Sequence, residues 1–237
     1  MLLGYQLGYG LGGNLGLSIG GSILPPLPAS AVFGLHSEIR CTSSSWTDFI
    51  GGRVLPGVNS PTVGTDGSNF RGRRVAQPTT TGSKYWLGSG LGTIVAAGAR
   101  PWMYVIGRAR SVPDALTRYF IQTNGVNGLS FRANGFRCLW DSAGSLTTAA
   151  AADTTPHEFS TWVTASLTNL QVDSNLTTTG GYTAAMVANM TSVGIGSDSI
   201  GGFIPDTAIA FVLICSSLPS VAERAALNAY SDSYWGV

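Results

Sequence analysis

The chain has 237 residues, of which 44% are hydrophobic, 10% aromatic and only 11% charged, and its formal net charge at pH 7 is +1. This length fits one large all-β domain with an appendage, and the apolar residues suffice for a core. Charged residues usually make up about a quarter of a soluble domain, so we expect a surface of Ser, Thr, Asn and Gly, typical of proteins that pack into assemblies or are displayed outside cells. The near-neutral balance gives no electrostatic reason for nucleic-acid binding or attraction to a membrane, and both are excluded as partners.

Residues 1–22 alternate apolar and small positions with a period of two. The even positions from Gly4 onward carry mostly glycine, and the large apolar odd positions are Leu3, Tyr5, Leu7, Tyr9, Leu11, Leu15, Leu17 and Ile19. The segment contains no Lys or Arg, and its glycines interrupt every apolar run before the ~20 residues of a membrane span, so neither a signal peptide nor an anchor is predicted. The period predicts an extended segment with one apolar side.

A helix is the alternative for this segment, because Leu-Gly recurs at positions 3, 7, 11 and 15 and would form an i, i+4 stripe. Each interior glycine costs a helix about 1 kcal/mol relative to alanine, which favours the extended form. An exposed, half-apolar strand aggregates unless something covers it. We therefore expect an attachment and oligomerisation arm that adds to a partner's sheet or lies along a neighbouring subunit, with a disordered Gly-rich leader as the alternative.

Short β-like runs follow a proline-rich linker that ends at Pro28. The predicted domains are the arm with its linker over 1–28 and a β-sandwich over 29–237. Turn residues separate the runs at sandwich spacing, and Asn-Gly signals predict one hairpin. The predicted strands include Tyr119–Gln122, Leu129–Arg132, Phe136–Trp140, Glu158–Leu167 and Leu170–Val172, with a loop over 149–152 and a polar loop over 177–182.

The C-terminal segment contains the plainest local signals. Thr207–Cys215 is an almost unbroken apolar run rich in β-branched residues and predicts a strand buried on both faces. Ser220 and Glu223 have the spacing of a capping box, which starts a helix. We predict that this helix places Leu227, Tyr230 and Tyr234 on one face and ends at Gly236.

This segment resembles the end of concanavalin A-like (laminin-G-like) β-sandwich domains, in which a last strand leads into a Ser-x-x-Glu-Arg helix ending in Tyr-x-x-x-Tyr-Trp/Tyr-Gly. The matching positions are Ser220, Glu223, Arg224, Leu227, Tyr230, Tyr234 and Gly236. Upstream, Val32–Leu35 resembles the opening strand of that family, Trp46–Gly52 its Trp-x-Asp-x-x-Gly turn, Pro101–Ile106 a central strand and Val193–Gly196 the strand before this segment. The resemblance therefore covers roughly residues 30–237. It implies an all-β fold, a concanavalin A-like antiparallel β-sandwich (jelly roll) with a short C-terminal helix.

Glycosidases on this fold carry paired carboxylates, typically as Glu-x-Asp-x-x-Glu on one strand, so that alternate residues face the same cleft. The glutamates of this chain are Glu38, Glu158 and Glu223, and no two share a predicted strand. Glu223 is already explained by its cap. We therefore assign no catalytic residue and predict that the protein is not an enzyme.

No metal or cofactor is predicted. His36 and His157 lie far apart in the sequence and are interpreted as surface or edge histidines. A phosphate-binding glycine loop and clustered calcium-type oxygens are also missing from the sequence. The cysteines at 41, 138 and 215 are interpreted as buried small hydrophobes, with a Cys41–Cys138 disulfide as the alternative.

Two further motifs leave alternatives open. The charge run Phe70–Arg74 predicts a solvated loop or a contact patch for an acidic neighbour. The tryptophans on strand-like runs are mostly core residues, but one at a strand end could stack on a sugar ring. Trp140 with Asp141 is the best candidate for ligand binding, because an aromatic ring adjoins a hydrogen-bonding carboxylate.

Three functions are compatible with these features. The first is a structural protein of a tailed bacteriophage particle, since sandwiches of the resembled family recur on phage structural proteins. It would be a head decoration or fibre protein or a tail fibre component, homo-oligomeric, assembled in the host cytoplasm and located in the virion, with capsid or tail proteins as partners. The second is a glycan-binding module for host surface carbohydrate. The third is an unusual glycoside hydrolase.

Overall fold

The computed structural model describes residues 23–111, 116–124, 127–132, 134–140, 144–148, 152–173, 176–181, 185–198, 201 and 204–237. The predicted arm, with Leu3, Tyr5, Leu7, Tyr9, Leu11, Leu15, Leu17 and Ile19, lies outside these residues. Its extended conformation, and the domain division at residue 28, therefore stay predictions. Within the described part of the chain, no helix is long and apolar enough to cross a membrane.

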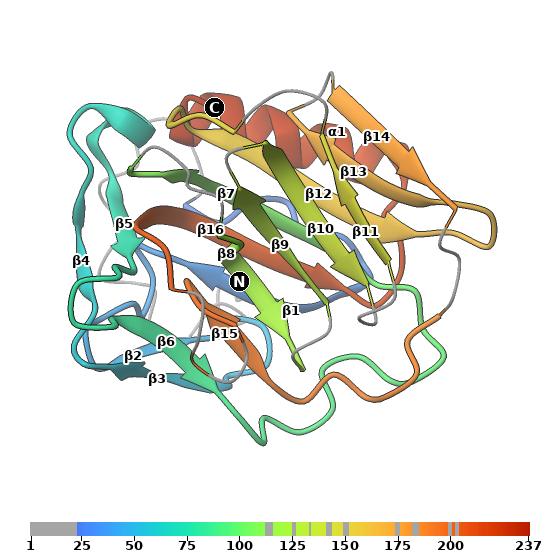
Figure 1. Cartoon of the computed structure of the whole chain (residues 1–237), viewed down its shortest axis with the longest axis horizontal. Coiled ribbons are helices and arrows are strands. Elements are labelled where there is room, and N and C mark those ends of the chain that lie inside the picture. The colour runs from blue at the N-terminus through green and yellow to red at the C-terminus, as the bar shows by residue number, and fades with distance from the viewer. Residues whose placement is uncertain are drawn as a thin grey trace, which may run out of the picture.

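Two antiparallel sheets of eight strands each form a sandwich, which confirms the predicted all-β class (Figure 1). The first sheet has the order β14-β13-β12-β7-β16-β5-β4, and β1 also pairs with β16. Its strands are β1 Ala31–His36, β4 Thr62–Thr65, β5 Arg74–Gln77, β7 Trp102–Ala109, β12 His157–Val163, β13 Thr168–Val172, β14 Leu176–Gly180 and β16 Thr207–Cys215.

The second sheet lies in front of the first in Figure 1 and has the order β11-β10-β9-β8-β15-β6-β3-β2. Its strands are β2 Ser45–Thr47, β3 Val54–Val58, β6 Tyr85–Gly88, β8 Arg118–Thr123, β9 Asn127–Arg132, β10 Gly135–Trp140, β11 Gly144–Thr147 and β15 Val193–Ile195. The predicted hairpin is formed by β8 and β9.

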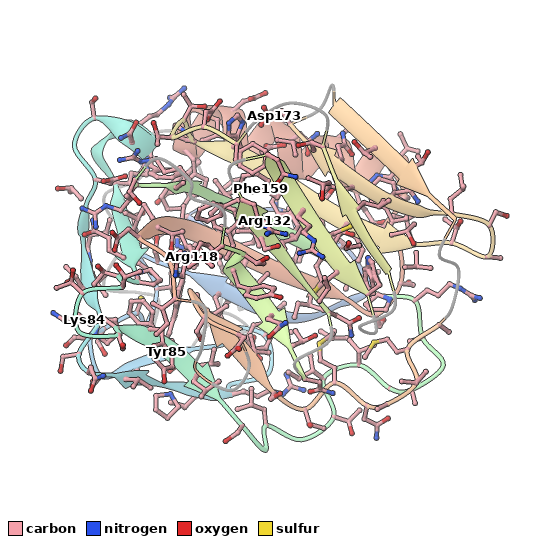
Figure 2. The ribbon with its side chains drawn as sticks, viewed as in Figure 1. Lys84, Tyr85, Arg118, Arg132, Phe159 and Asp173 are labelled. Atoms are coloured by element: carbon pink, nitrogen blue, oxygen red, sulfur yellow. The ribbon has the colours of Figure 1, made fainter. Side chains whose placement is uncertain are left out.

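Aromatic rings join the two sheets across the core. Phe159 of β12 packs on Phe120 of β8, with ring centroids 4.7 Å apart, and on Phe136 of β10 at 4.8 Å (Figure 2). Alternate residues of each strand point into this core, as the period of a strand requires. The period-two pattern of Phe159, Thr161 and Val163 thus faces inward, as the alternation in the sequence predicts.

β16 is buried along its whole length, which confirms the prediction from its apolar run. It pairs with β7 on one side and with β1 and β5 on the other. Ile209, Val212 and Ile214 belong to the core between the sheets. Phe211 and Leu213 belong to a second buried cluster on the outer face of the first sheet. Because both faces are covered, no polar residue interrupts the strand.

Residues 221–237, called here the C-terminal unit, cover that outer face. Helix α1 spans Val221–Tyr230 and a π-helical turn, η3, spans Ser231–Trp235. Ser220 Oγ accepts from the Glu223 amide at 3.2 Å, and Glu223 Oε2 accepts from the Ser220 amide at 2.8 Å, so the predicted capping box is confirmed. Gly236 adopts φ 75° at the end of η3, where the left-handed conformation favours glycine.

The predicted turn after the first strand is built on a buried carboxylate. Asp48 accepts hydrogen bonds from the amides of Gly34, Ile50 and Gly51, at 2.8 to 2.9 Å. Arg53 pairs with the same carboxylate at 3.0 Å. The aspartate is fully buried because these donors replace its water.

One predicted loop is wrong: residues 177–182 were expected to form a polar loop, but 176–180 form the edge strand β14, which pairs with β13.

The three cysteines are free and buried, which confirms their interpretation as small buried hydrophobes and excludes the alternative Cys41–Cys138 disulfide. Cys41 bridges to Trp46 of β2, at the far end of the second sheet from β10, which carries Cys138. Strands lie about 4.8 Å apart, so this separation exceeds the reach of a disulfide.

Replacing Ser220 and Glu223 together by alanine should remove both reciprocal caps of α1. We expect a loss of about 1–2 kcal/mol of unfolding free energy, or a fall in melting temperature of several degrees. Ser217→Ala is the matched control, because Ser217 is exposed and only its carbonyl accepts a hydrogen bond. Equal melting temperatures for the double variant and the control would contradict the structural role of the cap.

Candidate functional site

The outer face of the second sheet is the broad sheet surface that no described helix covers. The inner faces of both sheets form the core, and the C-terminal unit covers the outer face of the first sheet. Figure 1 is viewed from the remaining side, with β8, β9 and β10 in front of β7, β12 and β16. A ligand that binds a sheet face would therefore meet β8, β9 and β10.

Strand register shows which side chains share this surface. Arg137 of β10 lies opposite Ser130 of β9, and Ser130 lies opposite Tyr119 of β8. Their neighbours Phe131 and Phe136 point into the core, so the first three point outward. Two further outward positions, Arg132 and Gln122, follow from the same alternation. We call Tyr119, Gln122, Ser130, Arg132 and Arg137 the β8–β10 face. Tyr119, Gln122 and Ser130 are buried, so Arg132 and Arg137 are the members of this face that meet solvent.

Hydrogen bonds hold the basic side chains at one end of this face. Arg137 Nη1 donates to Thr117 Oγ1 at 3.2 Å, and Arg118 Nη1, at the start of β8, donates to the Ile204 carbonyl at 3.1 Å. Arg118 and Arg132 come from the neighbouring strands β8 and β9 (Figure 2). All three guanidinium-bearing residues are partly exposed. Of the three, Arg137 lies close enough to Tyr119 to act on its hydroxyl, whereas Arg118 lies opposite the inward-facing Phe131 and is not part of the β8–β10 face.

Tyr119 is the centre of this polar group. Burial raises the pKa of its hydroxyl, Arg137 and the Gln122 amide lower it, and Asp198 raises it further. The hydroxyl therefore stays protonated at neutral pH and acts as a hydrogen-bond donor and acceptor. Donors and acceptors of this kind match sugar hydroxyls, and guanidinium groups also bind carboxylates in a bidentate way.

Of the two residues predicted to bind a ligand, Trp140 and Asp141, the tryptophan is not accessible to one. Trp140 is 2% exposed, and its indole N–H donates to Thr161 Oγ1 at 2.9 Å. The ring is part of the core, so it presents no free face to a sugar. Asp141 lies outside the described residues, and its role stays a prediction. Trp86 and Trp102 are also buried, as the core interpretation predicts.

The predicted surface histidine at position 36 is instead fully buried. Its Nε2 lies 2.9 Å from the Tyr230 hydroxyl, and its ring lies 5.2 Å from that of Trp235. Burial lowers the pKa of His36 to about 3, so the imidazole is neutral. His36 therefore joins β1 to the C-terminal unit.

His157 lies between two aspartates that sequence reasoning did not connect with it. Its Nδ1 lies 2.8 Å from Asp173 Oδ2, and its Nε2 lies 2.9 Å from Asp153 Oδ1. Burial alone would lower the pKa of His157, but the hydrogen bonds and charges of Asp173 and Asp153 raise it above its usual value. The i, i+4 spacing of Asp153 and His157 was the available signal. Among the described residues, no three His, Cys, Asp or Glu side chains are placed to hold a metal.

The arginine run is not a solvated loop. Arg71 Nη2 donates to the Asp232 carbonyl and Arg73 Nε to the Tyr234 carbonyl, both at 2.9 Å. The Arg73 guanidinium also lies 3.6 Å from the centre of the Tyr234 ring. Phe70 is buried with its ring 6.3 Å from that of Trp235. The run therefore fixes the C-terminal unit to the sandwich.

The glutamates have separate structural contacts. Glu38 accepts from the Tyr234 hydroxyl and lies 3.6 Å from Arg73 Nη1. Glu158 is buried beneath the C-terminal unit, and Glu223 caps α1. Each of the three glutamates therefore has a different set of partners within the fold.

No family model and no curated protein matches the chain. Solved structures with a similar fold include Trypanosoma rangeli sialidase, with a TM-score of 0.62 and 14% identity over 87% of this chain and 33% of the sialidase. The binding domain of botulinum neurotoxin DC, solved in complex with rat synaptotagmin II, gives a TM-score of 0.61 with 10% identity over 86% of this chain and 52% of that chain. The binding domain of Paraclostridial Mosquitocidal Protein 1 gives 0.62 with 10% identity over 87% and 55%.

This chain spans about a third to a half of the length of the structures it matches. At 10–14% identity the likeness shows the fold alone. That fold is an antiparallel β-sandwich with lectin-like neighbours, in agreement with the resemblance of the C-terminal segment. The same architecture occurs in an enzyme and in binding domains, so the fold does not decide between these activities.

The His157 contacts predict a pH-dependent contribution to stability. A raised pKa in the folded state means that the contribution is fully present below about pH 6.5 and is lost as pH rises through the folded pKa. His157→Gln should therefore lower the free energy of unfolding by only about 1 kcal/mol at pH 5.5, because solvent screens the half-exposed aspartates. At pH 8.5 the loss should be clearly smaller, because the contribution of the ion pairs falls as pH rises. Urea unfolding at both pH values measures this difference. An equal loss at the two values would contradict the charged pairing, and Asp173→Asn should abolish the same pH dependence.

Proposed function

We propose that the chain is a non-enzymatic recognition module that binds carbohydrate on its β8–β10 face and is attached to a larger assembly through its N-terminal arm. The observation that carries this proposal is that Ile23, the first described residue, is held on the first-sheet side of the sandwich, opposite the β8–β10 face. The Tyr230 hydroxyl donates to the carbonyl of Ile23, the first described residue, at 2.8 Å. Tyr230 packs against Phe211 on the outer face of the first sheet. Attachment from that side would leave Arg132 and Arg137, the partly exposed residues of the β8–β10 face, accessible to a ligand.

The chemistry of the face supports a carbohydrate ligand. Arg132 and Arg137, which are partly exposed, supply charged donors, and the buried polar groups of Tyr119, Gln122 and Ser130 lie on the same face of the sheet. This combination favours a glycan that carries a carboxylate among its hydroxyls. A structure of botulinum neurotoxin type C with a similar fold, at a TM-score of 0.60 and 10% identity, concerns a cell entry that depends on interaction with two ganglioside molecules. That property belongs to the toxin, and the shared fold supports a glycan ligand for this chain.

The module is proposed to have no hydrolytic activity. Glu38, Glu158 and Glu223 are each engaged in contacts that hold the C-terminal unit or its cap. The sialidase with a similar fold is matched over only 33% of its length, so its activity is not transferred to this chain.

We also propose that the assembly is a tailed bacteriophage particle, in which the protein is a head decoration, a fibre or a tail fibre component. Capsid or tail proteins and further copies of the chain are the expected partners, and the virion is the expected location. Support comes from the uncharged, half-apolar arm and from a chain with only 11% charged residues, since neither feature suits a protein that stays free in solution.

Binding is tested on a glycan array that contains matched neutral and acidic oligosaccharides. Arg137→Ala should weaken binding of the best acidic glycan about tenfold, equivalent to about 1.4 kcal/mol, and Arg132→Ala, the other partly exposed arginine of the face, should weaken it as well. Arg100→Ala is the matched control, because Arg100 is exposed on a loop before β7 and away from the face. Binding that survives both face variants, or that Arg100→Ala removes equally, would contradict the proposed surface.

Attachment is tested with a variant that begins at Ser22, which keeps Ile23 and its contact to Tyr230. We expect it to fold like the full chain but to lose its oligomeric mass and its incorporation into particles, because burial of one apolar side of the arm contributes about 25 cal/mol per Å². Gly8→Val and Gly12→Val should also weaken assembly by steric exclusion. A truncated protein that assembles and incorporates normally would show that the arm is a disordered leader.

A further inference from the structure

The C-terminal unit closes an apolar sheet face, so its docking controls how much of that face meets solvent. Tyr104 of β7 and Phe211 and Leu213 of β16 form one buried cluster with Leu227 of α1 and Trp235 of η3. An exposed apolar sheet face of this kind promotes association with other chains. The contacts that keep the unit docked therefore matter beyond local stability.

A carboxyl group lies in this otherwise apolar interface. Glu158 of β12 is 7% exposed, and the Asn228 side-chain amide of α1, in the orientation that satisfies its hydrogen bonds, donates to Glu158 Oε2 at 3.2 Å. Five of the eight buried side-chain polar atoms without a hydrogen-bond partner in the described chain belong to residues of this interface or directly beside it: Trp102 Nε1, Tyr104 Oη, Glu158 Oε1, Ser231 Oγ and Trp235 Nε1. Buried polar groups are nearly always paired, so this concentration marks the interface as incompletely satisfied.

The charges around Glu158 disfavour its ionised form. Burial raises the pKa of Glu158 to about 7, the nearby Ser231 and Tyr104 hydroxyls lower it without completing a bond to Oε1, and the charges of Asp232 and Asp173 raise it.

Cations near Glu158 are engaged elsewhere. His157 is bound to Asp153 and Asp173, and the Arg224 guanidinium lies 5.8 Å from the Trp162 ring while donating to the Pro219 carbonyl. No described cation forms an ion pair with Glu158.

We propose that Glu158 is a proton-controlled latch, whose protonated carboxyl lets the C-terminal unit dock on the first sheet and whose ionised carboxylate loosens it. The direction of the effect follows from the raised pKa of Glu158 in the folded state. The stabilisation is complete below the ordinary glutamate pKa of 4.5 and is lost as pH rises through about 7. An ionised Glu158 would be buried beside other carboxylates, and the unit must then admit water or move away.

The latch also reaches the start of the described chain. Tyr230 of the C-terminal unit holds the Ile23 carbonyl at 2.8 Å, and Glu223 Oε1 accepts from the Ala29 amide at 2.9 Å. Loosening of the unit would therefore release the segment that leads into residues 1–22. A consequence for attachment rests on the proposed function of the arm, whereas the latch itself does not.

Hydrogen exchange of the full chain between pH 5.5 and 8.5, corrected for the intrinsic rate at each pH, tests the latch. Protection of amides in 221–237 should fall roughly 10- to 30-fold over this range in the natural sequence, because each pKa unit corresponds to a factor of ten. In Glu158→Gln, which is neutral and nearly the same shape, the fall should disappear. Glu38→Gln removes another carboxylate that contacts the unit and should keep the fall, as should His157→Gln.

A natural sequence whose 221–237 amides keep constant protection over this range would overturn the proposal, as would a Glu158→Gln variant with the same fall. If Glu158→Gln does not fold, 13C NMR of glutamate-labelled natural protein follows the carboxyl directly, and a Glu158 that titrates like an exposed glutamate overturns the latch. No glycan or particle enters these measurements, so failure of the latch and failure of the proposed function are separate results.

Discussion

Docking of the C-terminal unit on the outer face of β16 is the interaction on which the rest of the structure depends. β16 can be apolar on both faces only because the second sheet covers one face and this unit covers the other. Contacts from distant parts of the chain converge on it: Arg71 and Arg73 bind its carbonyls, His36 meets Tyr230, and Glu38 meets Tyr234. A short helix of ten residues is marginal alone, so these contacts stabilise it.

Docking of the C-terminal unit gives the sandwich two sides with different roles. The first-sheet side carries the C-terminal unit and holds Ile23 through Tyr230, whereas the second-sheet side presents the polar β8–β10 face. The few charged residues follow this division. Several arginines fix the C-terminal unit, and others lie on the outer face of the second sheet. This division is what makes attachment on one side and recognition on the other a physically consistent proposal.

Local signals in the sequence predicted much of the fold. The apolar run of β16, the capping box at Ser220 and Glu223 and the hairpin of β8 and β9 each depend on residues close in the chain. Burial of His36 was missed because its partner Tyr230 lies 194 positions away. The role of Arg73 was missed for the same reason, since Tyr234 is 161 positions from it. β14 was missed because a threonine-rich edge strand lacks the apolar alternation of a half-buried one.

The candidate site was harder to predict than the fold. Tyr119, Ser130 and Arg137 become neighbours only through the register of three strands, and nothing in their sequence spacing indicates it. The attractive pair Trp140–Asp141 failed at the tryptophan because alternation on β10 turns that ring toward Thr161 in the core. An aromatic residue at a strand end can stack on a sugar ring only where the alternation of the strand turns its side chain toward solvent.

The central claim is that ligand recognition takes place on the side of the sandwich opposite the C-terminal unit. Amide NMR of the full chain during titration with the glycan that binds best on the array tests it most directly. The account predicts shifts at Tyr119, Gln122, Ser130 and Arg137, with α1 unchanged. Shifts confined to α1 or to the segment around Ile23 would contradict it.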